Sequence, residues 1–225
     1  NVSLYNESKA TGGGSAILPT PAIGGVGLID DYEHMMTMPF KAAGETIYLL
    51  HAEEWATADP ERSHLGKSLW LSEIHGRDEG RAPPVDLLAE RGAGQIVLKL
   101  IDEGLLSAVH DCSDGGLIVA AAEMAFAGRV GLDIDLAGLP VIDSAPPRND
   151  HTRCFAETPS RYLLEVVPTQ LDQVMRCLRD ANVSFGQVGR FAEHDRLVVR
   201  TPHAGQLLDA SLDELREAWL GPLDW

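Results

Sequence analysis

The chain has 225 residues, of which 44% are hydrophobic and 23% are charged, and its formal net charge is −16 at pH 7. This composition predicts a soluble globular protein with a substantial core. Because a strongly acidic surface repels phosphate backbones, general nucleic-acid binding is disfavoured. An acidic protein still binds a phosphorylated small molecule where Mg²⁺, a helix amino terminus or a local Arg/Lys pair offsets the charge.

The cysteines and the apolar pattern indicate the compartment. Cys112, Cys154 and Cys177 are widely spaced and form no Cys-x-x-Cys pair, which argues against a zinc ribbon or a disulfide scaffold and favours a reducing, cytoplasmic setting. No apolar run reaches the ~18 residues that a membrane span needs, and nothing resembles a signal peptide, so no membrane association is expected. Because the chain opens at Asn1, in a segment typical of the middle of a protein, we expect a piece of a longer chain.

The first third of the chain is predicted to contain few regular elements. Residues 1–15 are polar and glycine-rich, which is typical of a loop, and residues 16–31 mix prolines, glycines and β-branched residues as an edge strand does. A weak boundary follows at 36–40. The apolar run 46–51 (TIYLLH) predicts a buried strand that opens the main domain, and residues 52–84 are expected to be irregular.

Helical and strand patterns then alternate to the end of the chain. The patterns first predict a helix over 85–91 that is interrupted at Gly92 and Gly94 and resumes over 95–104, with Gly104 at the C-cap. A strand over 105–109 and a helix from Asp114 to Phe126 follow, and then strands over 131–136 and 161–167. The last predicted elements are an amphipathic helix over 171–178, strands over 185–191 and 196–199, and a helix through Trp219. Ser211 and Glu214 form a capping box for that last helix. The order in the final third favours a split βαβ layer with mixed strand pairing.

The stretch AVHDCSDGGLIVAAAEMA places polar residues at a junction between strand and helix. Unpaired N–H groups and the positive end of the helix dipole would face Asp111 and Ser113. Asp111 suits Mg²⁺, and the Ser113 hydroxyl suits either a phosphate or the same metal ion. Because Gly115 and Gly116 lack a Cβ, another molecule can approach this helix end closely. The alternative is that Ser113 or Asp114 simply caps the helix and that the glycines allow tight packing.

Three further places offer polar groups for chemistry, and each has a plainer alternative. His110 suits acid–base catalysis near neutral pH or the orientation of a phosphate, and the alternative is a structural role at the end of an apolar run. Asn1 and Ser3 share a face of an extended segment and suit a metal and a phosphate, but a polar chain end also frays. Arg161, which follows Glu157 at a strand start, is either a solvated surface residue or a clamp for an anion.

Several motifs then occur together in one order. The chain carries NVSLYNE at 1–7, PTPAIGGVG at 19–27, HDCSDGGL at 110–117 and AEM at 122–124, with Ser160-Arg161 before a strand. In this combination the sequence resembles phosphoribosylformylglycinamidine synthase, and in particular the synthetase subunit or domain within the aminoimidazole ribonucleotide synthetase superfamily. The resemblance runs across most of the chain.

The resemblance implies a fold and a place in a longer protein. It implies an α+β domain in which a mixed sheet is flanked by helices, preceded by the last strands of an N-terminal domain. Residues 1–38 would be the tail end of that N-terminal-type domain, and residues 39–225 the synthetase C-terminal-type domain. The family's synthetase contains two copies of this two-domain unit, and the chain resembles the end of the second copy.

The resemblance also implies a reaction. In this family ATP activates the amide oxygen of formylglycinamide ribonucleotide, ammonia displaces phosphate, and the amidine forms with release of ADP. The ammonia comes from glutamine in a glutaminase domain or subunit, and Mg²⁺ accompanies ATP or ADP. The implied partners are therefore the phosphorylated ribonucleotide, ATP, a glutaminase and the remainder of the synthetase chain. The segment is expected to be inactive alone.

Site residues follow from the matching motifs. The resemblance implies Mg²⁺ ligation by Asn1 and Asp111, a substrate contact from Ser3, and nucleotide contacts from Ser113, Gly115 and Gly116, with no catalytic residue inside the chain. The nucleotide site would be the second one, which is structural rather than catalytic in large family members. The segment Glu157-Thr158-Pro159 departs from the Glu-Ser-Gln common in the family, and Pro159 has no N–H group to donate to a ligand.

Two other hypotheses compete with this interpretation. In the first, the chain is a non-catalytic structural or nucleotide-holding module that stabilises the enzyme and contacts partner subunits. In the second, it belongs to a different ATP-dependent enzyme of the same superfamily.

Overall fold

The computed structural model describes residues 5–6, 15–16, 23–41, 46–51, 63–139, 150–202 and 205–223. The chain divides into two compact units, Asn1–Glu33 and His34–Trp225. In the first unit, strand β1 (Tyr5–Asn6) pairs antiparallel with strand β2 (Ser15–Ala16).

The edge strand predicted over 16–31 is wrong for residues 23–31, which form no strand. The apolar side chains there, such as Val26 and Leu28, are fully exposed, so no burial offsets the cost of ordering the chain as a strand. Residues 17–22 lie outside the described part of the chain, and so do Asn1 and Ser3.

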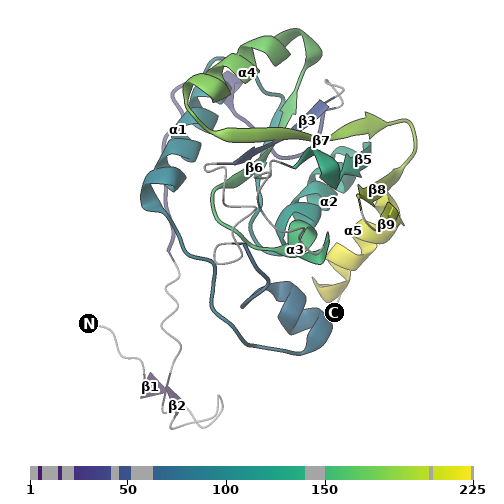
Figure 1. The fold of residues 1–225 in the computed structure, drawn as a ribbon. Coiled ribbons are helices and arrows are strands. Elements are labelled where there is room, and N and C mark those ends of the chain that lie inside the picture. The colour runs from purple at the N-terminus through teal and green to yellow at the C-terminus, as the bar shows by residue number, and fades with distance from the viewer. Residues whose placement is uncertain are drawn as a thin grey trace. The chain divides into compact units, whose positions relative to one another are not determined.

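The second unit is built on a mixed sheet (Figure 1). Its described strands are β3 (Thr46–His51), β4 (Ala108–Asp111), β5 (Gly131–Asp135), β6 (Arg161–Val166), β7 (Ser184–Ala192), β8 (Arg196–Thr201) and β9 (Gly205–Ser211). Among the described residues these seven strands form one sheet in the order β4-β6-β3-β7-β5-β8-β9. The β5–β8 pair is parallel and the other pairs described are antiparallel, as the expected mixed pairing requires.

Helices cover both faces of this sheet. The described α-helices are α1 (Leu87–Asp102), α2 (Gly116–Gly128), α3 (Asp150–Phe155), α4 (Leu171–Asp180) and α5 (Leu212–Leu220). Helix α1 packs beside α4, and α2 packs against α3 and α5 on the other side of the strands (Figure 1). The predicted class, an α+β fold with a mixed sheet flanked by helices, is confirmed.

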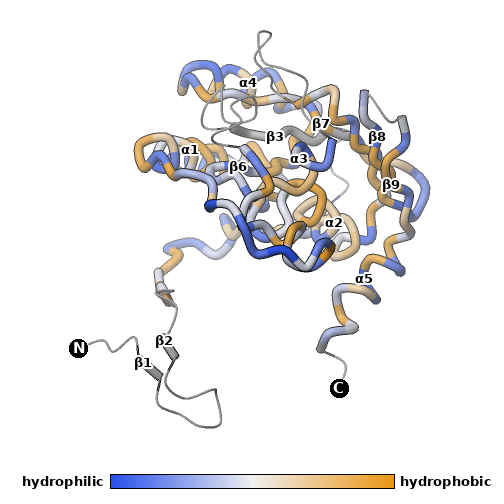
Figure 2. Tube along the Cα trace, turned by 60° about the horizontal axis from the view of Figure 1, so that its bottom comes forward, coloured by the Kyte–Doolittle hydropathy of each residue, from blue (hydrophilic) through white to orange (hydrophobic). Residues whose placement is uncertain are grey.

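Each face of the sheet has its own hydrophobic core. Successive residues of β6 point to opposite faces, so Leu163 packs in the core that contains Leu117 of α2, whereas Leu164 packs with Leu100 of α1 and Leu178 of α4. All five side chains are fully buried. Helix α2 is hydrophobic along most of its length (Figure 2), because the sheet, α3 and α5 surround it.

The predicted break at Gly92 and Gly94 is wrong, since α1 is continuous across both glycines. The carboxylate of Asp86 caps the helix by accepting hydrogen bonds from the N–H groups of Leu88 and Ala89, at 3.0 and 3.2 Å. The buried face of the helix begins at Ala93, between the two glycines, and continues with Ile96, Val97 and Leu100. Capping and burial together outweigh the roughly 1 kcal/mol that each glycine costs in a helix interior.

Other helices and strands begin or end a few residues away from their predicted boundaries. Strand β4 begins at Ala108 rather than at residue 105, because Leu105 and Leu106 are buried in the turn that follows α1. The capping box of α5 is confirmed, with the Ser211 hydroxyl accepting from the Glu214 N–H at 3.2 Å and the Glu214 carboxylate accepting from the Ser211 N–H at 2.8 Å. In the described segments no helix is both long enough and apolar enough to cross a bilayer.

Candidate functional site

The amino end of α2 is capped from a distant part of the chain. The N-cap is Gly115, with φ of +75° and no cap from a neighbouring side chain, so the alternative in which Ser113 or Asp114 caps the helix is wrong. The Gly115 N–H donates to Oε1 of Glu157 at 3.0 Å, and the Gly116 N–H donates to the Ser113 carbonyl oxygen at 3.0 Å.

The two glycines are required by packing within the chain. Gly116 has φ of +72°, and a Cβ there would lie 2.7 Å from the Ala156 carbonyl oxygen and 2.9 Å from that of Cys154. A Cβ on Gly115 would collide with the side chain of Val119 on the next turn of α2. Close packing within the chain therefore accounts for a glycine at both positions, which are buried.

A polar pocket of about 500 Å³ opens beside this helix end. Its described lining residues are Lys67, Ala82, Pro83, Val85, Glu90, Asp111, Cys112, Ser113, Asp114, Glu157, Pro159, Ser160, Arg161 and Tyr162. Asp111 and Ser113 line the pocket and are exposed, whereas Gly115 and Gly116 are buried and do not belong to its described lining. The pocket thus brings together two of the predicted site residues.

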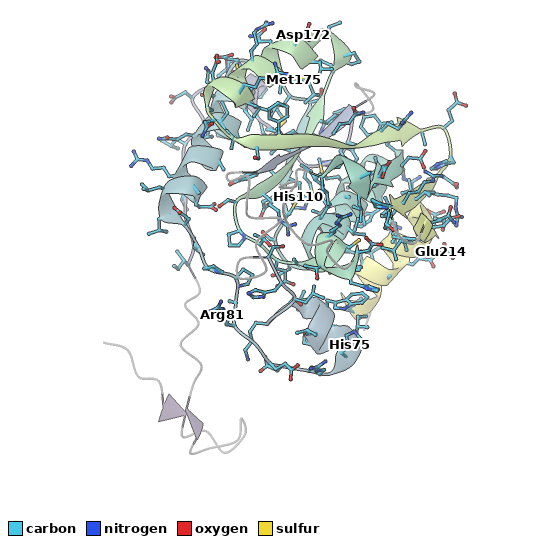
Figure 3. The ribbon with its side chains drawn as sticks, viewed as in Figure 1. His75, Arg81, His110, Asp172, Met175 and Glu214 are labelled. Carbon is cyan, nitrogen blue, oxygen red and sulfur yellow. The ribbon has the colours of Figure 1, made fainter. Side chains whose placement is uncertain are left out.

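Four side chains are linked in a row along one side of this junction. The Ser113 hydroxyl donates to Oδ2 of Asp111, and Oδ1 of Asp111 lies 3.2 Å from Nδ1 of His110. His110 is labelled in Figure 3, and its Nε2 atom lies 2.8 Å from Oε2 of Glu123 on α2. The hydrogen bond from Ser113 holds the pKa of Asp111 below its ordinary value. With both ring nitrogens facing carboxylates, His110 fits the structural alternative better than a free acid or base.

Arg161 stabilises the loop that carries Glu157. It is 3% exposed, and its guanidinium donates to the carbonyl oxygens of Thr158, at 3.1 Å, and of Ala156. Burial lowers the pKa of this guanidinium. The solvated-surface alternative is wrong, and the backbone contacts named here give Arg161 a structural role.

Several residues of the pocket could not be predicted from the sequence. Glu90 on α1 accepts a hydrogen bond from the Ser160 hydroxyl, and burial followed by the charge of Glu90 raises the pKa of Tyr162. Lys67 reaches the same pocket and forms an ion pair with Asp78 at 2.7 Å. These residues come from segments far apart in the sequence, so no local pattern could have grouped them.

The pocket has a negative balance of charge. Its described lining carries four acidic residues and two basic ones, namely Glu90, Asp111, Asp114 and Glu157 against Lys67 and Arg161. A bare phosphate would meet more negative than positive charge, so an anionic ligand needs a cation with it.

The side chains that line the polar pocket fit a Mg²⁺ ion only when a phosphate supplies further ligands. Within the described ranges, no group of three or more His, Cys, Asp or Glu side chains is placed to hold a metal ion. Asp111, Asp114 and Ser113 nevertheless offer exposed oxygens at one place. Since Mg²⁺ commonly binds through one or two carboxylates plus phosphate oxygens and water, these donors fit an ion that arrives with a phosphate rather than a dedicated protein cage.

A second, apolar pocket of about 240 Å³ lies near α3. Its described lining residues are Trp70, Ile118, His151, Cys154, Phe155, Val199, Leu207 and Leu208. Trp70 stacks on Phe155 with ring centroids 4.2 Å apart. Burial raises the pKa of Cys154 to about 12 and that of Cys112 to about 11, so neither thiol is a ready nucleophile. All three cysteines, which lie in described segments, are free.

The class of protein follows from these features: it is an α+β domain with helices on both faces of a mixed sheet and a polar pocket at a glycine-rich strand–helix junction. Residues 42–201 match the family described as AIR synthase related protein, C-terminal domain, and the chain belongs to this family. The match includes every strand of the sheet except β9.

Curated relatives carry the name that the motifs indicated. Phosphoribosylformylglycinamidine synthase subunit PurL of Erythrobacter litoralis is 53% identical over 97% of this chain and 27% of its own length. The subunit PurL of Novosphingobium aromaticivorans is 50% identical over 82% of this chain and 25% of its own length. The family resemblance is thereby confirmed, and the chain spans about a quarter of the length of these relatives.

Solved structures of the same fold come from Thermotoga maritima. PurL complexed with ADP superposes with a TM-score of 0.62 at 15% identity, covering 81% of this chain and 27% of that one. PurL complexed with FGAR gives 0.63 at 16% identity, covering 81% and 29%, and the PurLQS structure gives 0.61 at 16%, covering 81% and 28%. At these identities the likeness establishes the fold alone.

Proposed function

We propose that this chain is part of an ATP-dependent carbon–nitrogen ligase of purine biosynthesis, which converts formylglycinamide ribonucleotide and ammonia to formylglycinamidine ribonucleotide. Support comes from the curated relatives at 50–53% identity, whose name is that of this synthase. Structures of Thermotoga maritima PurL with ADP, with ATP and with FGAR agree with such a reaction. The catalytic residues of the proposed reaction would lie in the parts of the enzyme beyond this chain.

The proposed contribution of this chain is a supporting site for a Mg²⁺-bound nucleotide. The observation that carries the proposal is the meeting of Asp111, Ser113 and Asp114, all exposed, in one pocket of about 500 Å³ at the amino end of α2. In this proposal Asp111 holds Mg²⁺, which offsets the charge of the phosphates when it is bound. Ser113 orients a phosphate by donating a hydrogen bond.

The remaining expectations from the resemblance are part of the same proposal. Residues 1–38 would close a preceding N-terminal-type domain, in which Asn1 would hold Mg²⁺ and Ser3 would contact the ribonucleotide. Gly115 and Gly116 would assist the nucleotide through the backbone. A glutaminase would supply ammonia, and the Thermotoga maritima PurLQS structure is consistent with such an assembly. The cytoplasmic location stays a prediction from the cysteine pattern.

Calorimetric titration of this chain with Mg–ADP tests the proposed site. We expect Asp111→Ala to weaken binding by about tenfold or more, because charge-assisted contacts are each worth roughly 1.5–3 kcal/mol. Asp172→Ala is the matched control, since Asp172 is an exposed acid at the start of α4, outside the pocket, and its loss should leave binding unchanged. Equal affinity for the wild type and Asp111→Ala would contradict the proposed role of Asp111.

A second candidate function is a structural module that stabilises the enzyme without binding a nucleotide at this helix end and without taking part in the reaction. The observation favouring it is that the N–H groups of Gly115 and Gly116 both have partners within the chain. In the full-length enzyme, this candidate predicts that Asp111→Ala lowers the melting temperature while kcat stays unchanged. A loss of kcat at unchanged melting temperature would instead favour a direct part in turnover.

A further inference from the structure

Glu157 joins two segments that are far apart in the sequence. Its Oε1 atom accepts a hydrogen bond from the Leu69 N–H at 2.8 Å and another from the Gly115 N–H at 3.0 Å. The two donors lie 88 and 42 residues before Glu157. One carboxylate oxygen therefore ties the segment at Leu69 to the amino end of α2.

The Glu157 carboxylate lies at the amino end of α2, where a helix attracts an anion. The amino end of a helix carries N–H groups without a partner inside the helix and about half a positive charge, which stabilise anions such as a carboxylate or a phosphate. Glu157 is half-buried and lines the polar pocket, so the chain's own carboxylate already lies at the anion position that faces it.

The loop around Glu157 is held firmly on both sides. Arg161 donates to the carbonyl oxygens of Ala156 and Thr158, the two neighbours of Glu157. Gly116 packs so closely on Ala156 that a Cβ would not fit between them. Because the backbone is fixed, release of the α2 amino end requires rotation of the Glu157 side chain rather than movement of the loop.

We propose that Glu157 is an internal competitor for phosphate, which a nucleotide phosphoryl group must displace before it can reach the Gly115 N–H. The inference rests on the proposed nucleotide site and adds its regulation. Phosphate and carboxylate cannot share this donor, because like charges at hydrogen-bonding distance repel. A ligand that brings a divalent cation gains an advantage, since the cation can pair with the displaced carboxylate and with Asp111.

Displacement of the Glu157 carboxylate also affects the segment at Leu69 and Trp70. The Leu69 N–H loses its partner, and Leu69 immediately precedes the helical turn Trp70–Ile74. Trp70 of that turn stacks on Phe155, which belongs to the segment leading to Glu157. Ligand binding in the polar pocket should therefore change the surroundings of the Trp70 indole.

The test compares Glu157→Ala, Glu157→Gln and the wild type of this chain by calorimetric titration with Mg–ADP. Removal of the competing carboxylate should tighten binding about tenfold in Glu157→Ala, a change of roughly 1.4 kcal/mol. Glu157→Gln keeps a hydrogen-bond acceptor without the charge and should lie between the two. Glu217→Ala removes an exposed acid of α5 outside the pocket and should match the wild type.

Trp70 fluorescence gives a readout that does not depend on affinity. Taken as the difference from the matching Trp70→Phe protein, the Trp70 signal of ligand-free Glu157→Ala should resemble that of the wild type with Mg–ADP. Glu157→Gln serves as the informative variant if Glu157→Ala fails to fold, as judged by circular dichroism.

The outcomes separate this inference from the proposed function. Tighter binding in Glu157→Ala supports both. If the wild type binds Mg–ADP and the variants bind it with equal or lower affinity, the inference is overturned while the nucleotide site is supported. Binding in the variants without any in the wild type supports the inference and contradicts nucleotide binding by the unaltered chain. No binding in any protein overturns both.

Discussion

Gly116 and Ala156 lie so close that a Cβ on Gly116 would be 2.7 Å from the Ala156 carbonyl oxygen. Gly116→Ala should therefore lower the free energy of unfolding by at least about 2 kcal/mol, because it adds a collision to a φ of +72° that costs about 1–3 kcal/mol outside glycine. Urea denaturation followed by circular dichroism measures the loss, and an unchanged midpoint would show that this contact is not tight.

Gly92→Ala should stabilise the protein, in contrast to Gly116→Ala. Gly92 is exposed within α1, and no atom lies within 4 Å of an added Cβ. The change should raise the free energy of unfolding by about 0.5–1 kcal/mol, since alanine favours a helix interior over glycine. The same denaturation curves check it, and destabilisation would contradict the continuous α1.

Arg161→Lys should destabilise the loop that carries Glu157. A lysine lacks the forked donors that reach Ala156 and Thr158 together, so one buried carbonyl oxygen loses its partner at a cost of about 1–3 kcal/mol. Arg176→Lys, on α4, removes no such contact among those described and is the control. Hydrogen exchange at the Gly115 N–H should become faster in Arg161→Lys alone.

Ser113→Ala should raise the pKa of Asp111 toward its ordinary value, because the Ser113 hydroxyl is the main cause that lowers it. A carboxyl group with a lowered pKa in the folded state stabilises the protein above its unfolded pKa, about 4, and loses that effect as pH falls through the folded value. The variant should thus lose less stability on acidification. Carbon-detected NMR titration of Asp111 measures the change, with Ser72→Ala as a control that should not shift it.

Ser211→Ala should remove the cap of α5 and lower the free energy of unfolding by about 1 kcal/mol. Ser211→Asp keeps an oxygen that can accept from the Glu214 N–H and should retain most of the stability. Thermal denaturation of the three proteins provides the comparison. Equal loss in both variants would mean that the capping hydrogen bonds contribute little.

Elements with a strong periodic pattern could be predicted from the sequence. The alternation in residues 131–136 gave β5 correctly, and the spacing of Leu171, Val174 and Leu178 gave α4. Strand β9 was missed because it begins with Gly205-Gln206 and is half-exposed at the edge of the sheet, where burial imposes no clear alternation. Helix α3 was missed because it has 6 residues, fewer than two turns of periodicity.

The candidate site could be predicted in part. The motif placed Asp111 and Ser113 in one turn, and the structure brings both into the polar pocket. The hydrogen-bond partner of the N-cap residue Gly115 could not be predicted, because the acceptor of its N–H group is Glu157, which lies 42 residues further along the chain. Long-range partners of this kind follow from the pairing of β4 with β6, which sets the two loops side by side.

Binding of a Mg²⁺-bound nucleotide in the polar pocket at the amino end of α2 can be followed residue by residue in an amide NMR titration with Mg–ADP. We expect the largest chemical-shift changes at the N–H groups of residues 111–116 and of Glu157, and we expect Asp111→Ala to abolish them. Changes confined to other parts of the chain, or none at saturating Mg–ADP, would contradict nucleotide binding in this pocket.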